Sequence, residues 1–271
     1  MAVEAATRSD GSSPIVVLVS DLTTEDVRRR LGATKLPVRA DIVDGIAVAW
    51  DELGRPGEWL TGAQRAAVVV EVRNAWECRI CAERKAAVSP YSVTEEHPSY
   101  DGLPPSWVDV VHRLTTDSAR LTRRWYEDSL ATGIVENELI ELISVTCIAV
   151  TIDSFLEAIG VAWLAPPLVS TEAPARQHQP MAARGPGWAQ TIAPEDADGD
   201  FADFYADDMG FYIRRALTLE PTEARRFFAL MDRLYLHDPR VRELDGYDRA
   251  VSRAQMEFLA ARTSALLECF Y

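Results

Sequence analysis

Positive charge is scarce in this chain. Its 28 Lys and Arg residues are outnumbered by 42 Asp and Glu residues, which leaves a net charge of −14. Nucleic acids and anionic membranes are recognised through clustered basic side chains, so we expect neither as a partner. Hydrophobic residues make up 48% of the 271 residues, enough to bury a sizeable core as one large or two small domains.

Long apolar runs are also lacking. No uninterrupted run approaches the roughly 18–20 residues that a membrane-spanning helix needs. The short segment PIVVLVS at 14–20 follows a polar, acidic start, unlike the charged lead-in of a signal peptide. We therefore expect a cytoplasmic protein.

Helical periodicity accounts for most of what is present. Segments with apolar residues at helical spacing, bounded by capping residues, Pro or Gly, predict helices over 23–33, 61–88, 105–133, 135–160, 211–219, 221–236 and 252–271. The segment 14–20 is read either as a short strand or as a buried turn. The predicted fold class is all-α.

Proline density divides the chain. Residues 166–197 hold six prolines and predict a linker. It separates a first helical half at 55–165, preceded by an extension at 1–54, from a second half at 198–271. GAQRAAVVVEVRNAWEC and SRAQMEFLAARTSALLEC align so that Cys78 meets Cys269. The alignment suggests an internal duplication.

Cysteine is rare as well, with four in the chain, but two of them form Cys78-Arg-Ile-Cys81. At a helix start this spacing brings two sulfurs together, and the helix amides and the nearby Arg79 and Arg84 favour a thiolate. The pattern indicates thiol–disulfide exchange or reduction of an oxidant. Zinc is the competing interpretation, but a structural site needs four ligands and no second close Cys/His pair follows. A chance pair in a packed helix is the third reading. We expect no metal and no cofactor.

AQRAAVVVEVRNAWECRICAERK and SRAQMEFLAARTSALLECFY resemble the alkylhydroperoxidase D-like, carboxymuconolactone decarboxylase-like superfamily. The resemblance implies an all-helical bundle of two related halves and assembly into homo-oligomers. Redox-active members carry a Glu, eleven residues, Cys-x-x-Cys, three residues and a His. In them the second cysteine attacks the peroxide, the first resolves it, and the Glu and His relay the proton with a water.

The two halves keep this pattern unequally. The first keeps Cys78 and Cys81 but has Ala66 and Lys85 where the family has Glu and His. Glu71, seven residues before Cys78, is a candidate substitute base, with an ion pair to Arg73 or Lys85 as the alternative.

Histidines offer little further guidance. His112 could face the cysteine pair from another helix, although a structural role is the commoner one for such a residue. His97 and His178 lie in loop contexts that suggest no function, and Cys147 reads as a small core residue.

The second half keeps Glu257 and Cys269 at the family spacing, and the sequence then ends at Tyr271, just before the attacking position. One explanation is degeneration of that half. The other is a selenocysteine at position 272 whose UGA codon was read as a stop, since a selenol is a strong nucleophile.

The predicted function is a thiol-dependent, or selenocysteine-dependent, peroxidase or disulfide oxidoreductase that reduces hydroperoxides. Its catalytic residues would be Cys78, Cys81, Glu257 and Cys269. Its partners would be a peroxide or disulfide substrate and a thiol reductant. The alternative is a degenerate, non-catalytic family member that acts as an oligomeric scaffold or binding module.

Overall fold

The computed structural model describes residues 22–98, 102–205, 212–236, 243, 245 and 249–269. These residues form nine α-helices, several short 3-10 turns and one two-stranded antiparallel sheet. The all-α prediction is therefore confirmed for the described part of the chain. The strand or turn expected at 14–20 lies outside the described residues.

The helices follow one another in chain order with short connections. They are α1 Thr24–Gly32, α2 Ala40–Leu53, α3 Gly62–Trp76, α4 Arg79–Ala86, α5 Pro105–Asp117, α6 Arg123–Ala131, α7 Glu136–Ala158, α8 Pro221–Leu234 and α9 Arg253–Leu266. The 3-10 turns are η1 Pro90–Ser92, η2 Ser118–Arg120, η3 Pro194–Asp196, η4 Gly199–Phe201 and η5 Tyr212–Arg215, and the strands are β1 Ala183–Arg184 and β2 Gln190–Thr191.

Several helix starts are where the capping residues place them. Thr61 Oγ1 accepts from the Gln64 amide at 3.2 Å, and Gln64 Oε1 accepts from the Thr61 amide at 2.9 Å. This reciprocal pair satisfies two amides that the first turn of α3 leaves without a helical partner. The same arrangement begins α1 at Thr23 and α9 at Ser252. These boundaries confirm the sequence prediction.

Other predicted boundaries were wrong. The periodic segments 61–88 and 105–133 are each broken into two α-helices, and 211–219 forms only the 3-10 turn η5 in its described part. Helix α2 was not predicted. The Pro-rich segment carries β1 and β2, where no strand was expected. A periodic pattern reports which face is apolar, but it does not show where the chain turns between two helices.

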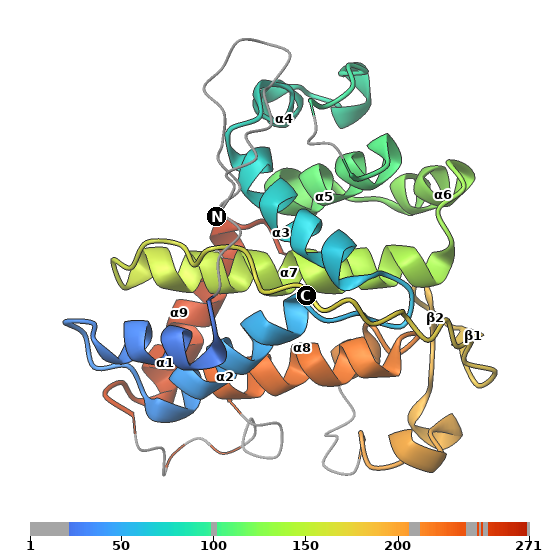
Figure 1. Ribbon diagram of the computed structural model, residues 1–271. Coiled ribbons are helices and arrows are strands. Elements are labelled where there is room, and N and C mark those ends of the chain that lie inside the picture. The colour runs from blue at the N-terminus through green and yellow to red at the C-terminus, as the bar shows by residue number, and fades with distance from the viewer. Residues whose placement is uncertain are drawn as a thin grey trace.

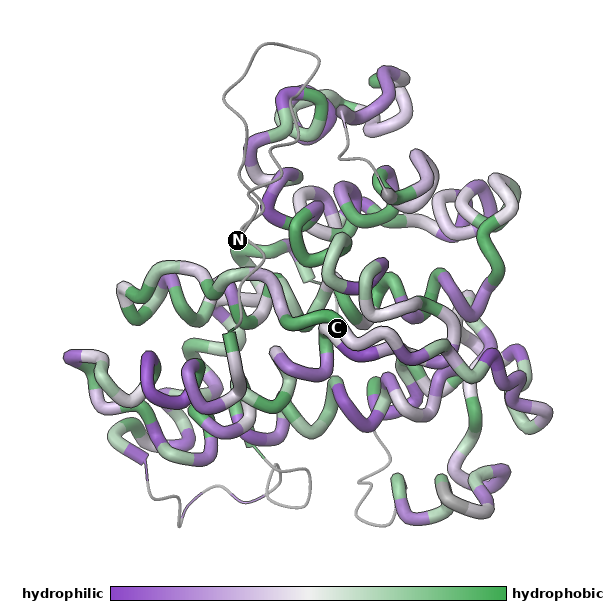
Figure 2. Tube along the Cα trace, viewed as in Figure 1, coloured by the Kyte–Doolittle hydropathy of each residue, from purple (hydrophilic) through white to green (hydrophobic). Residues whose placement is uncertain are grey.

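Helix α7 crosses the middle of the molecule, with α5 and α6 on one side and α2 and α8 on the other (Figure 1). α3 packs against both α5 and α7, and α4 packs against α5 at the end of the molecule away from α8. Hydrophobic and hydrophilic residues alternate along α1 and α8 (Figure 2), which both pack against α2. The fold therefore leaves α4 at the periphery, held by α3 and α5.

One core joins most of these helices. It holds buried side chains from α1 to α8, from Val27 to Leu230, and thus crosses the boundaries predicted at residues 54 and 165. α3 contributes Val68, Val69 and Val72, all fully buried. Each such side chain stabilises the fold by about 1.5–3 kcal/mol relative to exposure. α3 is thereby fixed as the base from which α4 projects.

A buried ion cluster lies within this core. Arg65 of α3 donates to Glu141 of α7 at 2.6 Å and to Glu223 of α8 at 2.8 Å, with all three side chains inaccessible to solvent. Glu141 Oε2 also accepts from the amides of Trp59 and Leu60. The backbone approaches closely here, since a Cβ on Gly57 would lie 1.8 Å from Glu141 Oε1. Arg65 therefore ties three helices together.

Helix α7 is, by length and composition, apolar enough to cross a membrane, which the search for uninterrupted apolar runs did not anticipate. In this fold, 67% of its most apolar window is buried inside the protein. Its Asp153 is paired with Arg73 of α3 at 2.8 Å. α7 is the central core helix of the bundle.

Helix α9 differs from the others because Arg253 is its only buried residue. Apolar side chains on and just after it are exposed: Phe258, Leu259, Leu266 and Leu267. The relation of this helix to α3 as a duplicated half stays a prediction, and so does assembly into homo-oligomers.

Candidate functional site

The break between α3 and α4 presents the two cysteines. α3 ends at Trp76, where the Glu77 amide bonds back to the carbonyl oxygen of Asn74 at 3.2 Å. Cys78 then adopts an extended conformation and forms the N-cap of α4, with its carbonyl accepting from the Ala82 amide. Cys81 follows in the first turn. The prediction that this motif lies at a helix start is confirmed.

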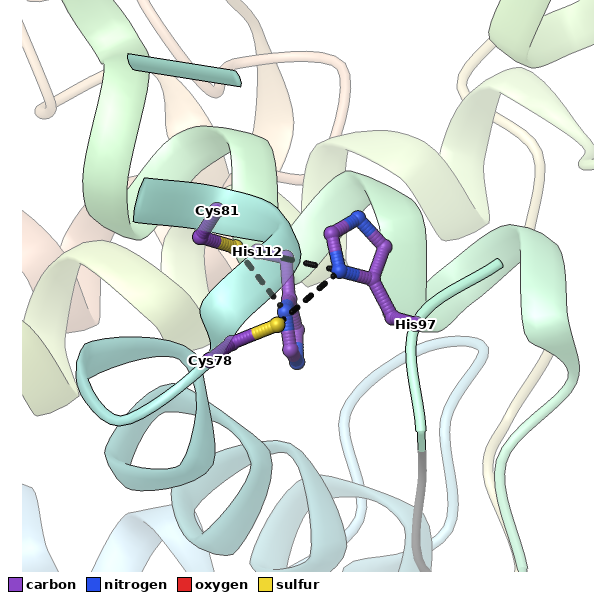
Figure 3. A group of neighbouring side chains, drawn as sticks. All are labelled: Cys78, Cys81, His97 and His112. Carbon is purple, nitrogen blue, oxygen red and sulfur yellow. Dashed lines mark hydrogen bonds between the residues drawn. The ribbon is translucent and has the colours of Figure 1, made fainter. Parts of the chain in front are cut away.

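Two histidines from other elements complete a compact group. Cys78, Cys81, His97 and His112, here called the Cys–His cluster, have one sulfur or ring nitrogen each, all within 4.8 Å of one another. His112 comes from α5 and His97 from the loop after η1, and Figure 3 shows the four side chains converging. Both cysteines are free thiols. This is the only such group of His, Cys, Asp and Glu found among the described residues.

His112 links Cys81 to a buried carboxylate. Its Nδ1 lies 3.2 Å from Cys81 Sγ, and its Nε2 lies 2.7 Å from Glu71 Oε1. Because a carboxylate only accepts, the Nε2 proton points to Glu71, and the Nδ1 lone pair is left facing the sulfur. His112 and Glu71 are both almost inaccessible to solvent. The imidazole is therefore held in one orientation and one tautomer.

His97 bridges both sulfurs and a second carboxylate. Its Nδ1 lies 3.4 Å from Cys78 Sγ and 3.8 Å from Cys81 Sγ. Its Nε2 lies 3.2 Å from Asp109 Oδ1 and 2.9 Å from Arg84 Nη1, which itself donates to Asp109 at 2.9 Å. The His97 ring thus has a donor and an acceptor beside Nε2, and either neutral tautomer finds a partner.

The two thiols differ in acidity. The hydrogen bond with Cys81 lowers the pKa of Cys78 far below its ordinary value, and His112 and His97 act in the same direction against burial. The same bond to Cys78, together with burial, raises the pKa of Cys81. The pair therefore carries one thiolate, on Cys78, stabilised by its neighbours.

The imidazoles are made more basic by their carboxylates. Burial acts against protonation of His97, but hydrogen bonds to Asp109 and Cys78 raise its pKa above the usual value. Burial likewise opposes protonation of His112, yet bonds to Cys78 and Glu71 raise its pKa. Either ring can accept a proton from a thiol of the pair.

A surface pocket reaches the Cys–His cluster from one side. It has a volume of about 540 Å³ and is lined by Cys78 and His97, but not by Cys81 or His112. Its other lining residues include three glutamates and one arginine: Glu77, Glu95, Glu96 and Arg79. Arg79 is paired with Glu95 at 2.7 Å. Cys78 is therefore the sulfur that a small molecule in this pocket meets.

The structure brings together some predicted residues and separates others. Glu71 does not pair with Arg73 or Lys85 but with His112 and Asn74, because Arg73 is engaged by Asp153. His112 faces the cysteines rather than serving packing alone. These two residues supply a Glu–His pair that the family pattern places at other positions.

His97 is the residue that the sequence analysis missed. It lies in a loop without periodicity, and only the acidic segment before it and the proline after it mark a turn. Glu257 lies on α9, where its carboxylate accepts from the Tyr235 hydroxyl and pairs with Arg253. Cys269 is an exposed free thiol. A second redox centre at Glu257 and Cys269 stays a prediction.

Fold and site together define an all-helical protein with a buried cluster of two cysteines and two histidines. No family model, curated protein or solved structure matches the chain. The superfamily resemblance therefore stays a prediction, and the function is argued from the site itself.

Proposed function

We propose that this chain is a thiol-dependent redox protein that reduces a hydroperoxide, or a disulfide, with the Cys78–Cys81 pair. The observation that carries the proposal is the arrangement around the pair. Cys78 lines a surface pocket, while Cys81 lies behind it against a His112–Glu71 pair. One sulfur can meet an oxidant, and the other has a base in contact.

The arrangement supports a two-step reaction. The Cys78 thiolate attacks the distal oxygen of the hydroperoxide, so that a sulfur–oxygen bond forms, the oxygen–oxygen bond breaks, and the alkoxide leaves as an alcohol after protonation. Cys81 then passes its proton to His112 and attacks the Cys78 sulfenic acid. A disulfide forms and water leaves. A dithiol reductant returns both sulfurs to thiols.

This assignment reverses the order that the family resemblance implies, in which the second cysteine attacks. It follows from the pocket, because Cys81 does not line it. It also gives each cysteine its own imidazole, with His97 at 3.4 Å from Cys78 and His112 at 3.2 Å from Cys81. The reducing partner, cytoplasmic location and oligomeric assembly remain parts of the proposal that rest on the sequence.

A single-turnover experiment tests the function and the order. The reduced, metal-free protein is treated with one equivalent of hydroperoxide, and the products are identified by intact mass and by a sulfenic-acid trap. The wild type should form a disulfide, Cys81→Ser should accumulate sulfenic acid on Cys78, and Cys78→Ser should not react. Cys147→Ala, which changes a thiol on α7, is the matched control.

The outcomes separate the readings. Sulfenic acid on Cys81 in Cys78→Ser would reverse the order. If neither thiol of the wild type is oxidised, the redox function is wrong and the scaffold alternative gains.

A further inference from the structure

We infer that the reduced Cys–His cluster binds one Zn²⁺ ion through Cys78 Sγ, Cys81 Sγ, His97 Nδ1 and His112 Nδ1. The sequence analysis rejected zinc because no second close Cys/His pair follows the cysteines. The fold supplies the missing ligands singly, one from a loop and one from α5. Four sulfur and nitrogen ligands are the set that structural zinc sites use.

The separations fit a tetrahedral ion. Zinc bonds of about 2.3 Å to sulfur and about 2.0–2.1 Å to nitrogen give sulfur–nitrogen edges of about 3.5 Å. The Cys78–His97, Cys81–His97 and Cys81–His112 edges are 3.4, 3.8 and 3.2 Å. No pair of ligand atoms is farther apart than 4.8 Å.

The partners of both histidines fit as well. Metal-bound histidines almost always donate their other ring N–H to a carboxylate, a carbonyl or water, which fixes the ring and makes it more basic. Glu71 accepts from His112 Nε2 in this way. Asp109 lies 3.2 Å from His97 Nε2 and can do the same. Two carboxylates behind two ligands are more than a hydrogen-bonded thiol pair requires.

One contact sets a condition on the site. Arg84 Nη1 lies 2.9 Å from His97 Nε2, so a metal-bound His97 with its proton on Nε2 would bring two donors together. Asp109 Oδ1 lies within reach of both and can accept from each. Asp109 is therefore the positioning residue on which zinc binding by His97 depends.

Zinc binding and disulfide formation exclude each other because they use the same sulfurs. If a hydroperoxide oxidises the zinc-bound thiolates, two electrons pass from the sulfurs to the oxygen–oxygen bond. With two protons taken up, the products are the Cys78–Cys81 disulfide, an alcohol, water and free Zn²⁺. Zinc binding itself needs only the reduced thiols and does not depend on the proposed function.

The test measures metal binding by the reduced, full-length protein. After removal of metal by a chelator, Zn²⁺ is titrated in competition with a colorimetric chelator, and Co²⁺ is titrated as a spectroscopic probe. We expect one ion per chain. We also expect the intense visible bands of tetrahedral Co²⁺, with sulfur-to-cobalt charge transfer.

Two variants make the test specific. His97→Ala removes a ligand from a loop outside the core and should lower zinc affinity by more than about 100-fold, and Asp109→Asn by about 10–100-fold. His178→Ala, a loop histidine that contacts Trp59, is the matched control and should bind as the wild type does. Circular dichroism of the metal-free variants checks that each is folded.

Zinc binding of unchanged strength in His97→Ala, or a weak octahedral Co²⁺ spectrum, would overturn the inference. Zinc binding with thiols that resist peroxide after metal removal would leave this inference standing and remove the redox function. Peroxide-driven disulfide formation without stoichiometric zinc binding would do the reverse.

Discussion

Glu71 and His112 lie 41 positions apart in the chain and share a buried 2.7 Å hydrogen bond. Glu71 comes from the third turn of α3 and His112 from the middle of α5, so the bond depends on the packing of these two helices. It orients the imidazole so that Nδ1 faces Cys81. The side chain that sets the proton position of His112 is thus on a different helix from both cysteines.

Replacing Glu71 should slow the second redox step but leave the first unchanged. In Glu71→Gln the amide can still accept from His112 Nε2, but the negative charge that makes the ring basic is lost. Disulfide formation after Cys78 oxidation should slow by about 10–100-fold, the range seen for outer-shell partners of histidine. Rapid-quench kinetics with mass detection would resolve the two steps. Glu127→Gln, on the exposed face of α6, is the control. Equal slowing of both steps would instead indicate a general structural defect.

Removing Arg65 should strongly destabilise the fold. Arg65→Met leaves Glu141 buried without its cation, and Glu223 with only Arg226 as a counter-charge. Breaking a buried pair from one side costs about 3–5 kcal/mol. Urea unfolding followed by circular dichroism would measure the free energy of unfolding.

Arg29→Met is the matched control for this change, because it removes an exposed pair with Asp26 on α1. Such surface pairs contribute about 0–1 kcal/mol. If Arg65→Met proved as mild as Arg29→Met, the view that Arg65 ties α3, α7 and α8 together would be wrong.

Stability should fall between about pH 4 and pH 8 because of Glu220. Burial raises the pKa of this carboxyl to about 8, against about 4.3 in an unfolded chain. The folded protein therefore holds the proton more tightly, so its stability relative to the unfolded chain decreases as pH rises through this window. Each unit of difference corresponds to about 1.4 kcal/mol, and the loss is complete above pH 8.

Glu220→Gln should remove this loss while keeping a side-chain oxygen that accepts from Asn137. The measurement is the free energy of unfolding of both proteins at pH 5 and pH 8. The other titrating groups are common to both proteins and largely cancel in the difference. A variant that loses as much stability as the wild type between these pH values would show that Glu220 is ionised in the folded protein at both.

The elements that were predicted well are those governed by local contacts. Thr61 with Gln64 and Ser252 with Gln255 start helices within one turn, using side chains three residues apart. The helix-start position of Cys78 and Cys81 follows from similarly short-range signals. The division of long periodic segments, such as α3 from α4, was not predicted. The chain turns there because α4 packs on α5, which is a contact between distant segments.

The candidate site shows the same division. The sequence alone determined that two thiols lie three positions apart at a helix start, and it named Glu71 and His112 as residues that could reach them. It assigned nothing to His97, whose partner Cys78 is 19 positions away. It also rejected a metal because it looked for ligands as close pairs. Only the tertiary structure decided that the loop after η1 folds back over α4, and that α5 turns His112 toward Cys81. Those placements depend on the packing of α3, α4 and α5 around one point, and no periodicity or spacing within a single segment encodes such packing.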